Sequence, residues 1–340
     1  MKASIDQLIQ IENIPSIQGL TFRSYSGLED CAFMAEIVNA ASQADGNKEF
    51  WSVEGFENQY KVLQRSDPDR DVIFIEIDGQ PVGYGRCTWN KEPDGKYIYE
   101  FRTYLKPEGR LPGIAEAMTN YFTNRIYEIA QEHPTDAPKH MQSWGANTES
   151  WYTGLLEKLD FEIIRYEFEM KRACADPVDV TPLPAGLEVR QPTPEQYRQV
   201  WEAQEEAFKD HWGFVEPTEN DYQWWLNFPH FEQDRTLWKV AWDGNEVVGM
   251  VLNFIAQKEN EEMNRKRGYT EFISVRKPWR RQGVARSLLT QSIQMFQEMG
   301  MEETALGVDA KNPNGALRLY ESAGYQEYKR VMIYRKPMNS

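Results

Sequence analysis

The chain contains the stretch Arg280-Arg281-Gln282-Gly283-Val284-Ala285 between a strand-like run and a helix-like run. Residues 269–275 before it alternate polar and apolar side chains and are rich in β-forming residues, which predicts a strand. Pro278 ends that strand. After the stretch, apolar residues recur at helical spacing over residues 284–299, and Gly300 stands where a helix C-cap would. The stretch therefore opens a helix.

The start of this helix is a candidate anion site. The first backbone N–H groups of a helix have no partner within it, and the macrodipole places partial positive charge there, so a phosphate is favoured. Gly283 would let a diphosphate approach the backbone closely, because it has no side chain. A surface helix that simply follows an Arg-rich turn is the alternative, and the spacing alone leaves both open.

A second pattern follows over residues 306–325. It begins as a strand, turns at Asn312 and continues as a short helix that bears Tyr320, with Gly324 as the cap and a final strand through Tyr334. Together with the first stretch, in this order and spacing, it resembles the GNAT superfamily of acetyl-CoA-dependent N-acetyltransferases. The resemblance covers about the last 150 residues. It implies an α+β fold, a mixed and mostly antiparallel sheet flanked by helices, and acetyl-CoA as cosubstrate.

The resemblance also implies where the cosubstrate binds. The preceding strand would splay from its neighbour, so that its backbone around Ile273 and Val275 pairs with the pantetheine arm. Arg280 would add positive charge, and Asn312 matches the position that reaches the pantetheine, although its loop is one residue longer than the commonest spacing. The backbone groups that would hold the CoA diphosphate are those of Arg281, Gln282, Gly283, Val284, Ala285 and Arg286.

Two side chains are candidates for proton transfer. Tyr320 matches the tyrosine that gives a proton to the departing CoA thiolate; outside this motif it would be interpreted as an aromatic packed beside Leu317. Direct attack needs a neutral amine, whereas an alkylammonium with a pKa of about 10.4 is protonated at pH 7. Glu271 matches the strand position where several family members keep a glutamate that acts as base or orients water. A solvent-facing strand carboxylate is the alternative for Glu271.

The chain carries the first pattern twice. Arg110-Leu111-Pro112-Gly113-Ile114-Ala115 lies 170 residues before its counterpart, again between a β-rich run at 97–105 and a helical run at 114–130. Asp78-Gly79, in a predicted hairpin turn, likewise matches Asp243-Gly244. Two copies of one fold are the economical interpretation.

The length of 340 residues also favours two domains. We expect an N-terminal GNAT-like domain at 1–175 and a C-terminal catalytic domain at 187–340. The stretch between them, 176–186, holds three prolines and shows no periodicity, which is typical of a linker.

The first copy lacks residues that the chemistry needs. Pro112 removes one backbone N–H from its anion site. Leu156 stands at the position of Tyr320 and can donate no proton; Tyr152, one helical turn earlier, either substitutes for it or packs in the core. We therefore predict a degenerate first domain beside an active second one, a plan similar to that of mycothiol synthase-like proteins.

An aromatic-rich stretch after the first helix of the second copy is the candidate acceptor site. In the GNAT family this segment covers the acceptor and varies with the substrate. An aromatic box with polar residues would suit a small amine, whereas packing between the domains is the alternative. The residues predicted to bind the acceptor are Asp210, His211 and Trp212.

Composition limits the partners. With 53 acidic and 38 basic residues the net charge is −15, which disfavours nucleic acid and suits a cationic amine. No apolar run is long enough for a signal peptide or a membrane span, and three cysteines fit a reducing cytoplasm. The four histidines show no zinc spacing, so no metal is predicted. We expect a cytoplasmic monomer or homodimer that acetylates a small-molecule primary amine in a ternary complex.

Two other functions remain open. In one, both copies bind CoA and are active. In the other, the chain is a noncatalytic acyl-CoA sensor or scaffold. The pairing of Tyr320 with Glu271 argues against the sensor, because a sensor needs neither a proton donor nor a base.

Overall fold

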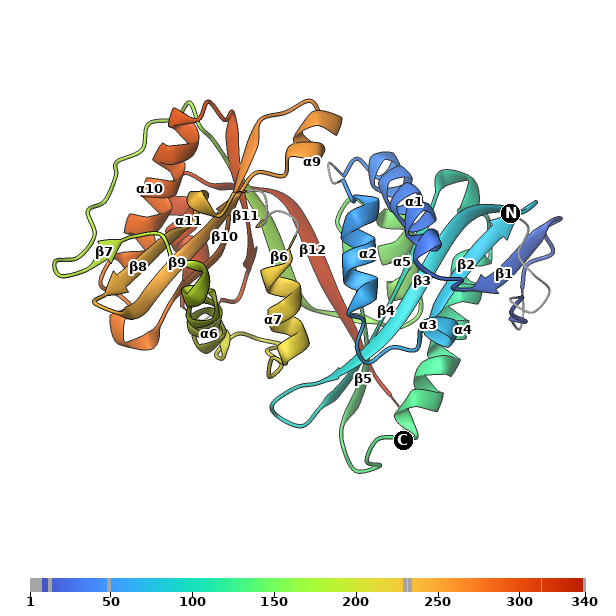
Figure 1. Cartoon of the computed structure of the whole chain (residues 1–340). Helices are drawn as coiled ribbons and strands as arrows, with labels where there is room; N and C mark the ends of the chain where they lie inside the picture. The colour runs from blue at the N-terminus through green and yellow to red at the C-terminus, as the bar shows by residue number, and fades with distance from the viewer. Residues whose placement is uncertain are drawn as a thin grey trace. The chain divides into compact units, whose positions relative to one another are not determined.

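The computed structural model of the chain describes residues 8–11, 14–47, 50–228, 231, 234–312 and 314–338. The chain forms two compact units, each a sheet with helices on its two faces (Figure 1). The first unit spans Met1–Arg165 and Val331–Ser340, and the second spans Tyr166–Arg330. The predicted α+β class is confirmed.

The sheet of the first unit has the strand order β1-β2-β3-β4-β5-β12. β4 and β5 are parallel, and the other neighbours are antiparallel. The predicted strand at 97–105 is confirmed as β4. The strands are β1 (Leu20–Ser24), β2 (Val72–Ile77), β3 (Gln80–Lys91), β4 (Tyr97–Leu105), β5 (Lys139–Ala146) and β12 (Gln326–Pro337), of which the part from Val331 belongs to this unit.

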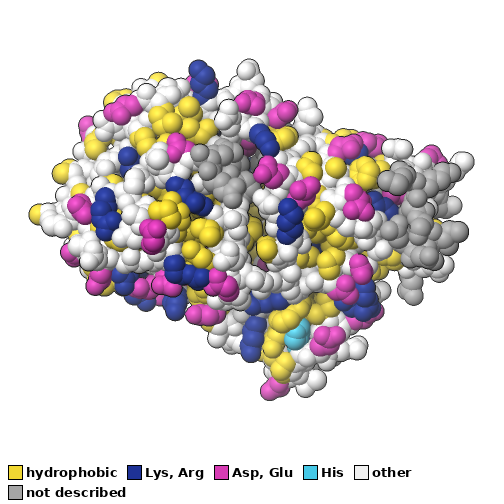
Figure 2. Space-filling model, in the orientation of Figure 1, with side chains coloured by type: hydrophobic (Ala, Val, Ile, Leu, Met, Phe, Trp, Pro, Cys, Tyr) yellow, Lys and Arg dark blue, Asp and Glu magenta, His cyan; other side chains and the backbone are white. Residues whose placement is uncertain are grey.

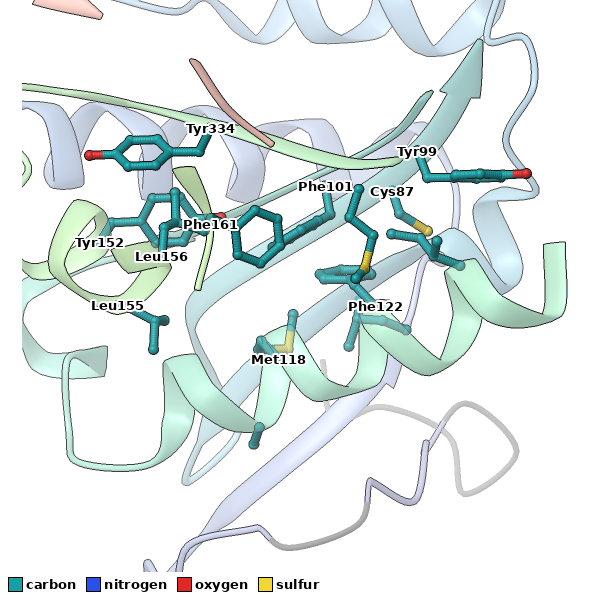
Figure 3. Packing of buried hydrophobic residues seen from close by; sticks show 14 of the residues in the cluster. Cys87, Tyr99, Phe101, Met118, Phe122, Tyr152, Leu155, Leu156, Phe161 and Tyr334 are labelled. Atoms are coloured by element: carbon teal, nitrogen blue, oxygen red, sulfur yellow. The ribbon is translucent and has the colours of Figure 1, made fainter. Parts of the chain in front are cut away.

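Helices cover both faces of this sheet. α4 and α5 pack over one hydrophobic core (Figure 3), and α1 and α2 pack over a second core on the other face. The helix predicted at 114–130 is confirmed as α4. The helices are η2 (Leu28–Asp30), α1 (Cys31–Ala44), α2 (Val53–Lys61), α3 (Pro68–Asp71), η3 (Pro107–Gly109), α4 (Ile114–Ala130) and α5 (Ser150–Lys158).

The second unit repeats this arrangement. Its strand order is β6-β11-β10-β9-β8-β7, with β10 and β11 parallel and the other recorded neighbours antiparallel. The strands are β6 (Glu162–Ala173), β7 (Glu188–Val189), β8 (Lys239–Asp243), β9 (Glu246–Phe254), β10 (Arg267–Val275) and β11 (Glu303–Asp309).

Two pairs of helices cover the faces of the second sheet. α10 and α11 pack on one face, where Leu289, Leu306 and Tyr320 share a core, and α6 and α7 pack on the other, where Trp201 and Trp225 are buried. The helices are η4 (Pro194–Gln196), α6 (Tyr197–Phe208), α7 (Glu219–Leu226), η5 (Arg235–Leu237), α9 (Gln257–Glu262), η6 (Lys277–Trp279), α10 (Val284–Glu298) and α11 (Ala316–Ser322).

The borders of the units differ from the predicted domain borders. β6 belongs by sequence to the first copy, but it pairs with β11 along Glu167–Ala173. β12 belongs to the second copy, but it pairs with β5 along Val331–Pro337. Each copy thus gives its last strand to the other sheet. Alternation of polar and apolar residues predicts a strand but not its partner, so these two pairings could not be derived from the sequence.

The predicted linker at 176–186 is not a free connection between the units. It has no helix or strand, as expected, but it lies within the second unit. Arg172 donates to the carbonyls of Asp176 and Pro177 at 2.9 and 2.7 Å, and the N–H of Thr181 donates to Thr290 Oγ1 of α10 at 3.0 Å. These bonds fix the segment against the helix that carries the candidate anion site.

Charged side chains of both signs are scattered over the face drawn in Figure 2, and neither sign forms a continuous patch there. The acidic side chains visible on this face are therefore not gathered in one place. None of the helices in the described ranges combines the length and apolar character that a membrane span requires.

Candidate active site

Strand β10 is irregular in the middle. It pairs with β9 up to Glu271, and the pairing resumes at Ser274 after a bulge in which Phe272 has a φ of 51°. Its parallel pairing with β11 covers only Arg267–Tyr269 against Glu303–Ala305, although β11 continues to pair with β6 as far as Asp309. Beyond Tyr269 the two parallel strands therefore separate, as the resemblance implied, and the segment with Ile273 and Val275 borders the gap.

The Arg280 stretch opens helix α10 as predicted. Gly283 is the N-cap in the left-handed region, with a φ of 91°, and a Cβ built on it meets no atom within 4 Å. Ser287 donates its N–H to the Gly283 carbonyl at 2.9 Å, which begins the helical ladder. The N–H groups before Ser287 have no helical acceptor, and Gly283 offers no side chain to cap them. An exposed, uncapped helix start is thus present.

Arg280 and Asp210 have other partners than those we expected. Arg280 donates to the carbonyls of Val275 and Ala207, both at 2.9 Å, and to Asp210 Oδ2 at 3.0 Å. The other oxygen of Asp210 accepts from Lys277 Nζ at 2.9 Å. These bonds tie the ends of β10 and α6 to the loop before α10, and the two cations lower the pKa of Asp210. Both side chains therefore stabilise the loop. Both carboxylate oxygens of Asp210 accept hydrogen bonds from these cations, so Asp210 has a structural role here instead of the predicted contact with the acceptor.

Glu271 lies where β10 and β11 separate. Its Oε1 accepts the N–H of Gly307 at 2.9 Å, and Gly307 belongs to the part of β11 that has lost its pairing with β10. Burial, with a contribution from the charge of Glu169, raises the pKa of Glu271 to about 8. A carboxyl group with this pKa can accept a proton and release it near neutral pH, which is the property of a general base.

Tyr320 projects from α11 into the core on the α10 face, and only 5% of it is exposed. Its pKa is raised by burial first and by the charge of Glu271 second, so the phenol stays protonated. The neighbouring Tyr325 has its hydroxyl bonded to Thr270 and Thr304, both at 2.9 Å, whereas the Tyr320 hydroxyl has no such bond to any described residue. Tyr320 thus has a proton available for a ligand.

Asn312 forms a local turn. Its side-chain oxygen accepts the N–H of Asn314 at 2.9 Å, and its carbonyl accepts the N–H of Gly315 at 3.2 Å. Asn314 in turn contacts Arg280 Nη1 at 3.3 Å. The loop therefore approaches the start of α10, and the contact of Asn312 with pantetheine stays a prediction.

The aromatic stretch divides into two parts. Tyr222 and Trp225 are buried in the core under α6 and α7, where Trp225 Nε1 donates to Gln204 at 3.2 Å. His211 and Trp212 follow the end of α6 and are half-buried, with the imidazole against Phe208 at a ring distance of 4.7 Å. Tyr222 and Trp225 therefore pack within the second unit, while the contact of His211 and Trp212 with an acceptor stays a prediction.

The corresponding helix start in the first unit is covered. Gly113 has a φ of 88° and caps α4 as Gly283 caps α10, but a Cβ on Gly113 would lie 3.1 Å from Pro15. Arg110 repeats the role of Arg280, because it forms a bidentate ion pair with Asp45 and donates to the carbonyl of Leu105. The loop has the same conformation in the two copies, but a phosphate placed beside Gly113 would collide with Pro15.

The gap between β4 and β5 in the first unit is filled. β4 pairs with β3 without a bulge, and Arg102, which matches Phe272 at the repeat spacing, donates to the carbonyl of Trp144 in β5. Arg102 also forms a buried ion pair with Glu149 and stacks at 4.2 Å on Tyr152. This ion pair occupies the place that the second unit leaves open.

Leu156 and Tyr152 are core residues of the first unit (Figure 3). Leu156 is fully buried, and the Tyr152 hydroxyl shares a hydrogen bond with Ser143 at 2.9 Å. Tyr152 thus has the packing role, one of the two interpretations that the sequence left open.

Comparisons with known proteins agree with this geometry. Residues 197–325 match the model of the Acetyltransferase (GNAT) family. N-alpha-acetyltransferase MAK3 of Arabidopsis thaliana is 35% identical over 86 residues, which are 25% of this chain and 45% of that protein. The chain thus spans about half the length of this curated relative.

Solved structures match nearly the whole chain. A GCN5-related N-acetyltransferase from Sphaerobacter thermophilus is 23% identical and aligns over 96% of this chain and 98% of its own, with a TM-score of 0.70. A tandem GNAT protein from the clavulanic acid biosynthesis pathway is 14% identical over 94% and 99%, with a TM-score of 0.63. At these identities the likeness concerns the fold, which is that of GNAT proteins. Residues 197–325 of this chain thus match the Acetyltransferase (GNAT) family, and the fold of the chain is similar to that of GNAT acetyltransferases.

Proposed function

We propose that the second unit binds acetyl-CoA at the start of α10 and transfers the acetyl group to a primary amine by direct attack. The observation that carries this proposal is the loss of pairing between β10 and β11 beyond Tyr269. It occurs in the same unit as an uncapped helix start and two groups, Glu271 and Tyr320, that can exchange protons.

The diphosphate would accept hydrogen bonds from the backbone of residues 281–286, where Gly283 leaves room. The pantetheine arm would pair with the β10 backbone at Ile273 and Val275, which the departure of β11 frees. Arg280 would act by holding the loop, because its guanidinium is already bonded to protein groups. Arg286 would link the first turn of α10 to α11, because it donates a hydrogen bond to Ser322 at 2.5 Å.

The reaction exchanges one bond for another. Glu271 removes a proton from the ammonium group, the neutral nitrogen attacks the acetyl carbon, and a C–N bond replaces the C–S bond. Tyr320 gives its proton to the sulfur as the thiolate leaves. The nitrogen loses its second proton as the amide forms, and that proton restores the Tyr320 hydroxyl through water, while Glu271 returns its own proton to solvent. No covalent acetyl-enzyme is needed, because both substrates would be present together in a ternary complex.

The first unit would not take part in this chemistry, because its helix start is covered by Pro15 and its gap is filled by Arg102 and Glu149. In plan, one degenerate and one complete copy resemble mycothiol synthase-like proteins, although no residue here specifies their acceptor. The rival in which both copies are active would require each of these obstructions to move. The acyl-CoA sensor would leave the raised pKa of Glu271 without a use.

We infer a small-molecule or chain-terminal amine as acceptor, with His211 and Trp212 beside it. The curated relative is named for acetylation of α-amines, so peptide α-amines belong in the first tests. Trialanine and glucosamine represent an α-amine and an amine carried on a sugar.

The test measures CoA release with these two amines for the wild-type chain and for two matched variants. Gly283→Glu and Gly300→Glu each place a carboxylate at a left-handed position, with φ of 91° and 73°, in open space at opposite ends of α10. We expect Gly283→Glu to abolish transfer and Gly300→Glu to preserve it. Equal activity of the two variants would refute binding of the diphosphate by the backbone of residues 281–286.

A further inference from the structure

Gly307 is an exposed residue of β11, and it faces the side of the second sheet that α6 covers. Its neighbours Leu306 and Val308 point into the core beneath α10 and α11, together with Tyr320. Side chains alternate along a strand, so position 307 faces the opposite side. A Cβ on Gly307 would lie 3.8 Å from Glu271 Oε1, which places the carboxylate of Glu271 on that same side. The sheet thus separates the face of the proton donor from the face of the base.

Glu169 lies across Gly307 from Glu271. It is the direct partner of Gly307 in the antiparallel pairing of β6 with β11, and directly paired residues point to the same face. Its neighbours Phe168 and Met170 face the core with Leu306 and Val308, which confirms the alternation. Because Gly307 has no side chain, nothing from β11 stands between the two carboxylates.

The Glu169 carboxylate is held from β12 and remains open. Tyr328 donates its hydroxyl to Oε2 at 2.7 Å, and Lys329 Nζ lies 2.6 Å from Oε1. The side chain of Glu169 is still 30% exposed, whereas that of Lys329 is 8% exposed. Two carboxylate oxygens offer about four acceptor sites, so further hydrogen bonds can form.

We propose that Glu169 is a positioning residue of the acceptor site and that, with Glu271, it holds the incoming amine as its ammonium ion over Gly307. This inference rests on the proposed function. Glu169 comes from the last strand of the first copy, so the exchange of strands would give the otherwise inactive half of the sequence a part in the acceptor site. An amine with a free ammonium group fits such a site; a carboxylate or phosphate would be repelled from it.

The charges around the pair agree with this role. The charge of Glu169 raises the pKa of Glu271 after burial has done so, and Glu271 in turn raises the pKa of Tyr320 on α11. On the other side Glu169 faces Tyr328 and Lys329 of β12. Arg267 of β10 and Arg265, which precedes it, also act on Glu169 and lower its pKa against the effect of burial. An ammonium ion between the carboxylates would relieve their repulsion, and its proton would pass to Glu271.

The alternative is that Glu169 serves only as the counter-ion of Lys329. The two roles differ in the expected effect on the amine KM. Glu169→Gln removes a negative charge near Glu271 and would lower the pKa of Glu271, and Lys329→Gln removes one of the cations near Glu169 and would raise it. Both shifts follow from charge alone and show only that the two carboxylates interact. The positioning role also predicts a raised amine KM in Glu169→Gln, whereas a counter-ion of Lys329 predicts an unchanged one.

The experiment titrates the Glu271 carboxyl by ¹³C NMR in the full chain, with its signal assigned by loss in Glu271→Gln. It is performed on the wild type, Glu169→Gln and Lys329→Gln, and KM for trialanine and glucosamine is measured alongside. For Glu169→Gln we expect a lower pKa, an amine KM raised about tenfold by loss of a charged hydrogen bond, and an unchanged Kd for acetyl-CoA. Glu169→Asp, which keeps the charge, would restore part of the KM.

Unchanged titration of Glu271 and unchanged amine KM in Glu169→Gln, with acetyl-CoA bound and amine still acetylated, would overturn this inference and leave the proposed function intact. Absence of amine acetylation in the wild type would overturn both. A raised amine KM in Glu169→Gln with an unchanged Kd for acetyl-CoA, partly restored in Glu169→Asp, would support the positioning role.

Discussion

The two units carry the same loop and helix start, yet only one leaves the helix start uncovered. In both, an arginine pins the end of a strand to the end of a helix through an aspartate, as Arg110 does with Asp45 and Arg280 with Asp210. What differs is the surroundings: Pro15 covers Gly113, whereas Gly283 faces open space. The motif therefore specifies a loop conformation, and the availability of a binding site depends on residues outside the motif.

The same contrast holds where the parallel strands separate. In the first unit the ion pair of Arg102 with Glu149 lies where β4 and β5 separate. In the second unit β10 has a bulge at Phe272, and Glu271 lies where β10 and β11 separate. In the first unit the position holds an ion pair, whereas in the second it holds a partly buried carboxylate with a raised pKa. Burial of a carboxylate without a cationic partner costs stability, and carboxylates with raised pKa values are frequent in active sites.

Removal of the proton donor gives the largest expected effect. Tyr320→Phe should lower kcat about 100- to 1,000-fold, because the thiolate then leaves without a positioned acid, and the Kd for acetyl-CoA should not change. Steady-state kinetics and calorimetry check the two values. Tyr152→Phe is the matched control in the first unit: it loses the bond to Ser143 and about 1 kcal/mol of stability, with kcat unchanged. A kcat of Tyr320→Phe equal to the wild-type value would remove the general acid from the account.

Disruption of the filled gap should act on stability alone. Arg102→Met leaves Glu149 buried and unpaired, which costs about 3–5 kcal/mol, as measured by urea unfolding. Acetyl transfer by the folded protein should be unchanged. The double variant Arg102→Met with Glu149→Leu removes both charges and should recover most of the loss. If Arg102→Met reduced kcat while the protein remained folded, the first unit would contribute to catalysis as well as to stability.

The pH dependence sharpens the role of Glu271. The folded pKa lies above the ordinary carboxyl value, at about 8, and the base acts in its ionised form. Activity should therefore rise with pH, with kcat/KM about tenfold higher at pH 9 than at pH 7 from this group alone. Glu271→Gln should remove this limb and leave only the titration of the amine. An identical pH profile in Glu271→Gln would show that another group or water is the base.

Exposure of the covered helix start should have the smallest effect. Pro15→Ala removes ring atoms that lie near Gly113, but Pro112 still lacks an N–H and Leu156 still cannot donate a proton. We expect a stability change below about 1 kcal/mol and no additional acetyl-CoA bound, as measured by calorimetry. A second equivalent bound by Pro15→Ala would mean that the cover alone silences the first unit.

The sequence predicted the elements of the site that depend on local pattern. The strand, the helix start at Gly283, the short helix with Tyr320 and the repetition at Arg110 follow from periodicity and turn residues, and the structure contains them all. The positive φ of Phe272 has no local signal, since an aromatic residue rarely adopts it. The engagement of Asp210 by Lys277 and Arg280 depends on residues about 70 positions away, which spacing alone does not indicate.

The exchange of β6 and β12 between the units explains why other residues near the site could not be predicted from the sequence. The pattern of β6 and β12 identifies two strands but leaves their partners undetermined, so Glu169 carried no signal as part of the second unit. Gly307 gives no signal for a related reason, because a glycine in a strand indicates close approach without showing which group approaches. Both residues gain meaning only from the register of β6 against β11.

We expect one unit of this chain, and only one, to bind acetyl-CoA. The test is calorimetric titration of the full chain with acetyl-CoA, with Gly283→Glu and Gly300→Glu titrated in parallel. One equivalent should bind to the wild type and to Gly300→Glu, and none to Gly283→Glu. Two equivalents in the wild type, or undiminished affinity in Gly283→Glu, would contradict this expectation.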